Sequence, residues 1–138
     1  MAHWLLKSEP GTWSWDRQVA AGTEVWDGVR NHQARNTLQA MAAGDRAFFY
    51  HSVRDTAVVG IVEVVGPARP DPTDPTGRWV AVDVRAVRPF VRPVTLKQIK
   101  ADPALADMVL VRNSRLSVQP VAEEEWLLVC EMGHTSPD

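Results

Sequence analysis

The sequence predicts an α+β fold, a small mixed β-barrel of five or six strands with short peripheral helices. Strand-like apolar segments recur along the chain, and short helical patterns interrupt them at irregular intervals. That order lacks the regular strand–helix alternation of a doubly wound parallel sheet. The length of 138 residues suits a single domain with its own core, spanning residues 1–138.

The expected strands are rich in β-branched and aromatic residues and end at turn signals. Residues 57–65 form an uninterrupted apolar run, which is typical of a strand buried on both faces. Residues 79–87 alternate, so Val80, Val82, Val84 and Ala86 should face the core. Residues 127–130 are compatible with a last strand or with the end of a helix. The other expected strands are residues 3–8 and 47–52.

Helices are expected where a side chain that can cap a helix N-terminus precedes a helical pattern. Ser14, Asn31 and Thr95 stand at such positions. Residues 67–77 hold four prolines and are predicted to be a surface loop outside any ladder or helix. The expected helices are residues 15–21, 31–41 and 96–101, with helical turns at 103–107 and 121–126.

The composition excludes several classes of protein. Hydrophobic residues make up 45% and charged residues 23%, which is ordinary for a globular chain. A single cysteine, Cys130, excludes an intrachain disulfide and a zinc site built from several cysteines. No apolar run approaches the roughly 20 residues that span a bilayer. We therefore expect no membrane segment, metal or cofactor, and a reducing compartment: the cytoplasm of a bacterium or the nucleus of a eukaryote.

The charges are unevenly distributed although the net charge is only −2. Residues 78–120 carry eight Lys or Arg against three Asp, while residues 121–138 are acidic. A local basic face can bind a polyanion despite a negative total. A solvated surface of mixed charge explains the same pattern.

Four polar segments are candidates for a binding site. Residues 7–9 end the first strand, Trp26 precedes a turn and a helix start, and residues 51–52 end the aromatic strand. Each has a purely structural alternative: a solvated loop, a core tryptophan followed by a helix cap, a hydrogen-bonded histidine. The fourth segment, 110–119, offers phosphate donors, which internal salt bridges explain equally well.

Together these segments resemble the EVE domain family. The resemblance is carried, in the family's order, by residues 4–10, 26–36, 48–52, 59–64, 95–100 and 112–120. One departure is His32, where an aromatic residue, often Tyr, is usual. The resemblance implies a PUA-like fold and a non-catalytic role, since the family is regarded as readers of modified bases in DNA or RNA, related to the YTH readers.

A reader must take the modified base out of the stack and hold it in a pocket. We expect Trp26 to stack on that base, with polar groups of the two strand ends converging near it. The expected base-binding residues are Lys7, Ser8, Glu9, Trp26, Arg30, Asn31, His51 and Ser52. The expected phosphate-binding residues are Arg112, Ser114, Arg115 and Ser117.

Two other functions stay open. Some ASCH-type relatives of the PUA-like superfold are small amidohydrolases that act on acylated cytidine with a Lys, a Thr and a Glu. Lys7, Ser8 and Glu9 offer similar groups, but neighbours in a strand point to opposite faces, so their convergence requires a bend. A protein-binding scaffold is the third possibility, and an unpaired N-terminal strand edge would favour it.

Overall fold

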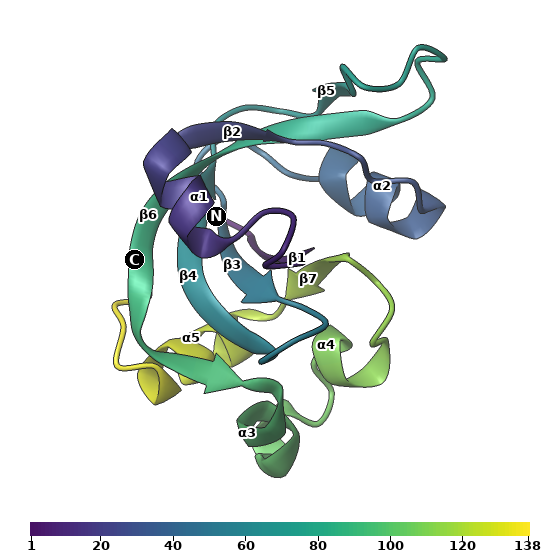
Figure 1. Ribbon diagram of the computed structural model, residues 1–138. Coiled ribbons are helices and arrows are strands. Elements are labelled where there is room, and N and C mark those ends of the chain that lie inside the picture. The colour runs from purple at the N-terminus through teal and green to yellow at the C-terminus, as the bar shows by residue number, and fades with distance from the viewer.

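A computed structural model describes residues 1–138. A single strongly curved sheet forms the body of the molecule, with short helices around it (Figure 1). The strands are β1 (His3–Ser8), β2 (Thr23–Trp26), β3 (Arg46–His51), β4 (Ala57–Val64), β5 (Arg69–Pro70), β6 (Val80–Thr95) and β7 (Val118–Val121). The helices are α1 (Trp15–Ala21), α2 (His32–Gln39), α3 (Leu96–Ala101), α4 (Val109–Arg112) and α5 (Glu123–Met132), with a 3₁₀ turn at Pro103–Leu105.

The sheet has the strand order β2-β6-β4-β3-β1-β7, and the short β5 pairs with β6. β1 and β3 run parallel, and every other pairing is antiparallel. The predicted mixed α+β architecture with short peripheral helices is therefore confirmed; it has seven strands, one more than the five or six expected, because the two-residue β5 joins the edge of β6. β2 and β7 are the two ends of the strand order, so the hydrogen-bonded ladder does not close between them.

β1 lies inside the sheet, paired with β3 on one side and β7 on the other. The N-terminal strand consequently presents no free edge, and the feature that would favour a protein-binding scaffold is missing.

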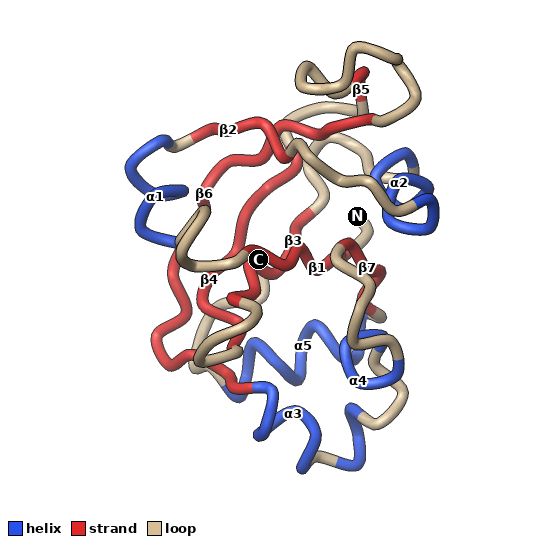
Figure 2. The backbone as a smooth tube through the Cα atoms, turned by 45° about the vertical axis from the view of Figure 1, so that its right-hand side comes forward, coloured by secondary structure: helices blue, strands red, loops and turns tan.

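The two faces of the sheet carry two separate cores. Side chains alternate along a strand, so Trp4 and Leu6 enter one core while Leu5 enters the other. β3 divides in the same way, with Phe49 on one face and Phe48 on the other. Phe48 stacks on Trp126 of α5 at 3.9 Å between ring centroids. Figure 2 shows α3, α4 and α5 grouped at one end of the sheet, away from α1 and α2.

Capping side chains begin the helices where the sequence predicts them. Ser14 accepts a hydrogen bond from the Arg17 backbone N–H, and Thr95 forms a reciprocal capping box with Gln98. α2 begins after Asn31, whose side chain accepts from the Ala34 N–H, and α2 ends at Gln39, two residues before the predicted limit.

Residues 127–130 belong to α5, the second of the two alternatives for this segment, because Trp126, Val129 and Cys130 bury one face of a helix. Other elements differ from expectation. β6 continues to Thr95, well beyond residue 87, and its Val82 and Val84 are fully buried as predicted. Within the proline-rich loop, Pro70 pairs with Val80 in the two-residue β5, contrary to the prediction of no ladder. This position is tolerated because β5 is an edge strand.

No helix of the fold is long and apolar enough to cross a membrane. No group of three or more His, Cys, Asp or Glu side chains is placed to hold a metal ion.

Candidate functional site

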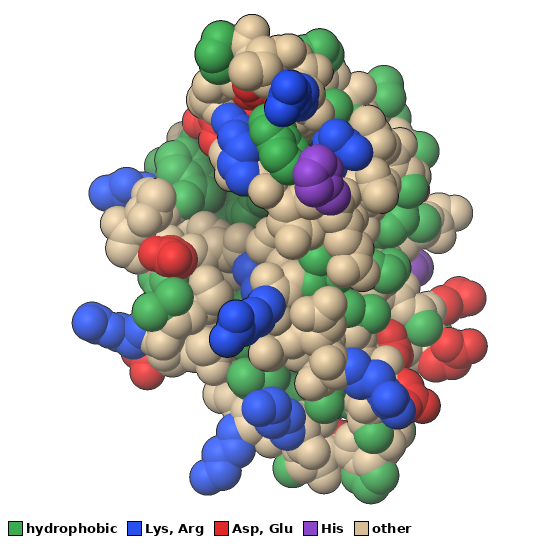
Figure 3. All heavy atoms as spheres, turned by 90° about the vertical axis from the view of Figure 1, so that its right-hand side faces the viewer, with side chains coloured by type: hydrophobic (Ala, Val, Ile, Leu, Met, Phe, Trp, Pro, Cys, Tyr) green, Lys and Arg blue, Asp and Glu red, His purple; other side chains and the backbone are tan.

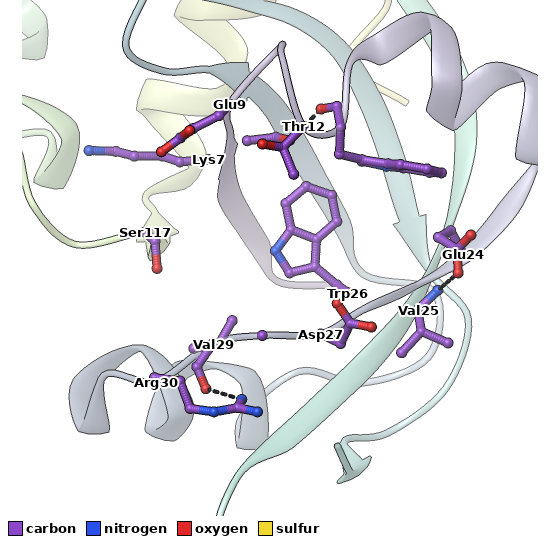
Figure 4. A pocket seen from close by; sticks show the side chains of 13 residues that line it. Lys7, Glu9, Thr12, Glu24, Val25, Trp26, Asp27, Val29, Arg30 and Ser117 are labelled. Atoms are coloured by element: carbon purple, nitrogen blue, oxygen red, sulfur yellow. Dashed lines mark hydrogen bonds between the residues drawn. The ribbon is translucent and has the colours of Figure 1, made fainter. Parts of the chain in front are cut away.

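A cavity lies where the sheet fails to close. Its volume is about 660 Å³, within the range of small-molecule sites. It is bounded by the end of β1, by β2 with the loop that follows, and by the residue before β7 (Figure 4). The lining residues are Lys7, Ser8, Glu9, Thr12, Trp13, Glu24, Val25, Trp26, Asp27, Gly28, Val29, Arg30 and Ser117.

Trp26 stands at the centre of this cavity (Figure 4). It ends β2, pairs with Val82 of β6, and packs edge-on against Phe49 at 5.5 Å between ring centroids. Only 9% of the residue is exposed. Its indole nitrogen lies on the side of Lys7 and Ser117.

The indole N–H of Trp26 has no hydrogen-bond partner in the protein. Trp4 donates to Asp45, Trp13 to Gln18 and Trp126 to the Pro137 carbonyl, whereas the indole N–H groups of Trp15 and Trp79, like that of Trp26, have no acceptor in the protein. Because Trp26 lines the cavity and its indole nitrogen is unpaired, it offers the cavity both a ring and a free donor.

Lys7 lines the cavity, but its amine points away from the Trp26 ring (Figure 4). The amine donates to the Ser114 carbonyl at 2.6 Å. Burial lowers the pKa of Lys7, because the charged form loses hydration. Lys7 therefore joins the end of β1 to the loop at residues 113–117.

Ser8 and Glu9 also line the cavity, since the chain bends directly after β1. The Glu9 carbonyl accepts from the N–H groups of Thr12 and Trp13, which closes a turn there. The Ser8 hydroxyl donates to the Trp13 carbonyl and holds that turn in place. The bend brings all three residues of the 7–9 segment to one cavity, so the geometric objection to their convergence is removed.

A buried carboxylate fixes the wall formed by residues 28–30. Asp71 accepts from the Gly28 N–H at 2.8 Å and from the Arg30 guanidinium at 3.0 Å. It also accepts from the backbone N–H and hydroxyl of Thr73, both at 2.7 Å. Burial acts to raise the pKa of Asp71, but these hydrogen bonds outweigh it and lower the pKa to about 2. Arg30 is thereby held at the cavity, leaving part of its side chain exposed.

The opposite part of the lining is acidic. Glu24 accepts from the Val25 N–H, so its carboxylate is partly engaged. Asp27 has a raised pKa because of burial and because Asp71 and Glu24 lie nearby. The lining thus carries donors from Arg30 and Trp26 together with acceptors from Glu9, Glu24 and Asp27, while the Lys7 amine is bonded to the Ser114 carbonyl. Such a set can hydrogen-bond a polar heterocycle along more than one edge.

Three of the predicted base-binding residues do not line the cavity. The side-chain oxygen of Asn31 accepts a hydrogen bond from the Ala34 N–H and caps the helix. His51 accepts the Trp15 N–H at 3.1 Å, and burial lowers its pKa. Ser52 donates its backbone N–H to the Ser8 carbonyl. The two strand ends do run side by side, but His51 and Ser52 support the residues of the cavity from outside it.

The predicted phosphate-binding residues are divided. Ser117 lines the cavity, and Ser114 borders it through its bond to Lys7. Arg112 forms an exposed ion pair with Asp107, as the structural alternative proposed. Arg115 is exposed and forms no ion pair.

Seven of the 13 lining residues lie outside the predicted set of site residues: Thr12, Trp13, Glu24, Val25, Asp27, Gly28 and Val29. Thr12 and Trp13 enter through the bend after β1, and Glu24, Asp27 and Val29 enter because β2 is an edge strand. The one local signal near the bend is Ser14, which caps the N-terminus of α1 and so places Thr12 and Trp13 in the loop before that helix. No periodic pattern marks β2, which has only four residues.

The family model of the EVE domain matches residues 2–132. The chain belongs to the EVE domain family. Thymocyte nuclear protein 1 from human is 34% identical over 175 residues, covering 99% of this chain and 76% of that protein. Among solved structures, Rpa0253 from Rhodopseudomonas palustris is 57% identical with a TM-score of 0.93, covering 97% of this chain and 94% of that one.

A second solved structure is that of human THYN1 protein in complex with DNA that contains 5-methylcytosine. It is 36% identical to this EVE domain with a TM-score of 0.89, and the match covers 99% of this chain and all of that one (100%). These matches confirm the PUA-like α+β fold that the resemblance implies.

Proposed function

We propose that residues 1–138 form one EVE domain that binds nucleic acid and reads a modified base, held in the cavity beside Trp26. The single observation that carries the proposal is the central Trp26, which is largely buried and lines the cavity with an unpaired indole N–H. A flipped base can stack on the indole ring of Trp26, and a ring nitrogen or carbonyl of that base can accept the indole N–H.

The lining supports the same ligand class. Carboxylates such as Glu9 and Asp27 can accept from an exocyclic amine, as carboxylates do from cytosine. Arg30 and Lys7 supply positive charge on the other part of the lining, where a phosphate next to the base would lie. The related human protein, crystallised with 5-methylcytosine-containing DNA, makes that base the first one to test.

The proposed role is non-catalytic. The side chains that would have to act as nucleophile or base are already committed to holding the fold: the Ser8 hydroxyl to the Trp13 carbonyl, and the Lys7 amine to the Ser114 carbonyl. Neither points its reactive atom at a free neighbour of the kind that activates a nucleophile.

Amide hydrolysis on modified nucleosides is the second candidate, and the convergence of Lys7, Ser8 and Glu9 at one cavity favours it. Incubation with acylated cytidine decides between the two. The reader role predicts no product above background. Turnover that disappears in both Lys7→Ala and Glu9→Ala, with folding intact, would assign the cavity to the hydrolase.

A binding screen tests the reader role. The purified protein is titrated with matched oligonucleotides, DNA and RNA, single- and double-stranded, that differ only in one base modification, starting with 5-methylcytosine. The proposal predicts that at least one modified ligand binds more tightly than its plain counterpart at the same salt concentration. Equal binding of every modified and plain pair would contradict base reading and leave only a general affinity for the backbone.

A further inference from the structure

A second aromatic residue, Trp79, gathers positive side chains on the outside of the cavity wall. It directly precedes β6, and side chains of α2 and of the loop before α2 lie around its ring. The His32 ring lies at 4.9 Å from it with a tilt of 35°, and the guanidinium carbons of Arg35 and Arg30 lie at 5.6 and 5.9 Å. We call Arg30, His32, Arg35, Arg78 and Trp79 the Trp79 cluster.

The Trp79 cluster has more positive charge than its neighbours neutralise. Arg30 is paired with the buried Asp71, but Arg35 and Arg78 form no ion pair. Arg35 donates to the Arg78 carbonyl at 3.3 Å, and its Nε is buried without a partner. The other nearby carboxylate, Asp74, is engaged by Thr76 and by the Trp79 backbone N–H. Free guanidinium donors therefore remain at the surface.

The Trp79 ring preorganises the guanidinium groups of Arg30 and Arg35, which lie over it. A guanidinium over an aromatic face is held in a defined plane, which lowers the entropy lost when it binds a ligand. Planar guanidinium groups with free N–H donors match the geometry of phosphate oxygens. The arrangement is more typical of a phosphate-binding surface than of isolated solvated arginines.

The cluster is continuous with the cavity through Arg30, which lines the cavity and also lies over the Trp79 ring. Figure 3 shows this face, where Lys or Arg side chains and a histidine gather around a hydrophobic side chain next to a hollow in the surface. A base held in the cavity stays bonded to its strand, so its neighbouring phosphates must cross the cavity border.

We propose that the Trp79 cluster binds the phosphodiester backbone of the strand as it leaves the cavity over α2. The proposal rests on the proposed function, because it takes the base in the cavity as its starting point. Arg30 contacts the phosphate nearest the base. Arg35 and Arg78 contact the adjacent phosphate of the strand. His32 and Trp79 hold these side chains in position. The cluster adds affinity and direction but no base discrimination, since phosphates carry no sequence information.

Salt-dependent titration of a modified and a plain oligonucleotide tests this proposal. The variants are Arg35→Gln, which keeps most of the stem, and Trp79→Leu, which removes the stacking ring. The matched control is Arg92→Gln, an exposed arginine without an ion pair near the far end of β6. Thermal unfolding of each variant verifies that it is folded.

Arg35→Gln should weaken both ligands equally and make the slope of log K against log salt shallower by about one counterion. Trp79→Leu should act in the same direction, and Arg92→Gln should change nothing. If Arg35→Gln shows the same salt slope and affinity as the Arg92→Gln control, the Trp79 cluster does not bind the phosphodiester backbone, even where the modified base is still preferred.

The reverse outcome is equally informative. A salt slope that depends on Arg35, without any preference for the modified base, would support backbone binding by the Trp79 cluster and contradict the proposed reading of a modified base. Competition by poly-glutamate as effective as competition by plain oligonucleotide at equal charge would assign the cluster to acidic protein segments and overturn the proposal.

Discussion

The amine of Lys7 donates a hydrogen bond of 2.6 Å to the carbonyl of Ser114, which lies 107 residues further along the chain. A second bond runs in parallel, from the Lys7 backbone N–H to the Ser117 carbonyl at 2.9 Å. These two bonds hold the loop at 113–117 against the end of β1. One border of the cavity is therefore held by Lys7 through both its side chain and its backbone.

Replacing that lysine tests the dependence. Lys7→Met keeps the apolar stem but removes the donor, so the loop at 113–117 should exchange its amide hydrogens faster while the rest of the sheet is unchanged. Hydrogen exchange followed by mass spectrometry measures this effect. Lys97→Met, on the exposed face of α3, is the control. Unchanged exchange in the loop would mean that its backbone bonds to β1 suffice.

Asp71 should make the cavity wall sensitive to acid. Its pKa in the folded protein is about 2, below the ordinary value near 4 of an unfolded aspartate. A depressed pKa contributes stability that is complete above the unfolded value and is lost as the pH falls from about 4 towards 2. Unfolding followed across this range should show less acid-dependent loss in Asp71→Asn than in the wild type.

The same substitution lowers stability at neutral pH. Asp71→Asn cannot serve all the donors of Gly28, Arg30 and Thr73, and each buried donor left unpaired costs about 1–3 kcal/mol. Asp107→Asn breaks only the exposed ion pair with Arg112, so the free energy of unfolding should change by less than about 1 kcal/mol. Denaturant titration compares the two variants, and equal effects would contradict the role of Asp71.

Asp71 also illustrates the limit of sequence reasoning. It lies in the proline-rich stretch that reads as an ordinary surface loop, yet its carboxylate organises residues 28–30 from a distance of 41 to 43 positions. No local pattern encodes such a contact. By contrast, the caps at Ser14 and Thr95 act on bonds three residues away and were predicted correctly.

The strands also fall into two groups, those that local sequence predicts and those that depend on a distant partner strand. β1, β3 and β4 carry continuous apolar or aromatic runs, so their positions follow from the sequence. β2 and β7 have four residues each and exist because β6 and β1 offer them a partner. Since the cavity forms at these two edge strands, much of its lining could not be predicted from local sequence patterns.

Gly60 is a second test of the packing that positions the site. A Cβ at this position would lie 2.5 Å from the Trp15 ring, which in turn packs against Phe49. Gly60→Ala should therefore destabilise the fold by about 1–3 kcal/mol through overpacking. Gly66 has no atom near the same position and an ordinary backbone angle, so Gly66→Ala should be close to neutral. Thermal unfolding of both variants checks the prediction, which fails if the two are alike.

The central claim is that Trp26 contacts the modified base, and its most direct test is the ratio of affinities for modified and plain oligonucleotide in Trp26→Phe. Phenylalanine keeps an aromatic ring but lacks the indole N–H. The control is Trp15→Phe, a change in the same core at a residue that does not line the cavity. We predict that the ratio falls towards one in Trp26→Phe, with stacking and the lost donor accounting for up to about 1–3 kcal/mol, and stays at the wild-type value in Trp15→Phe. A folded Trp26→Phe protein with an unchanged ratio would show that Trp26 belongs only to the core and that the base is read elsewhere.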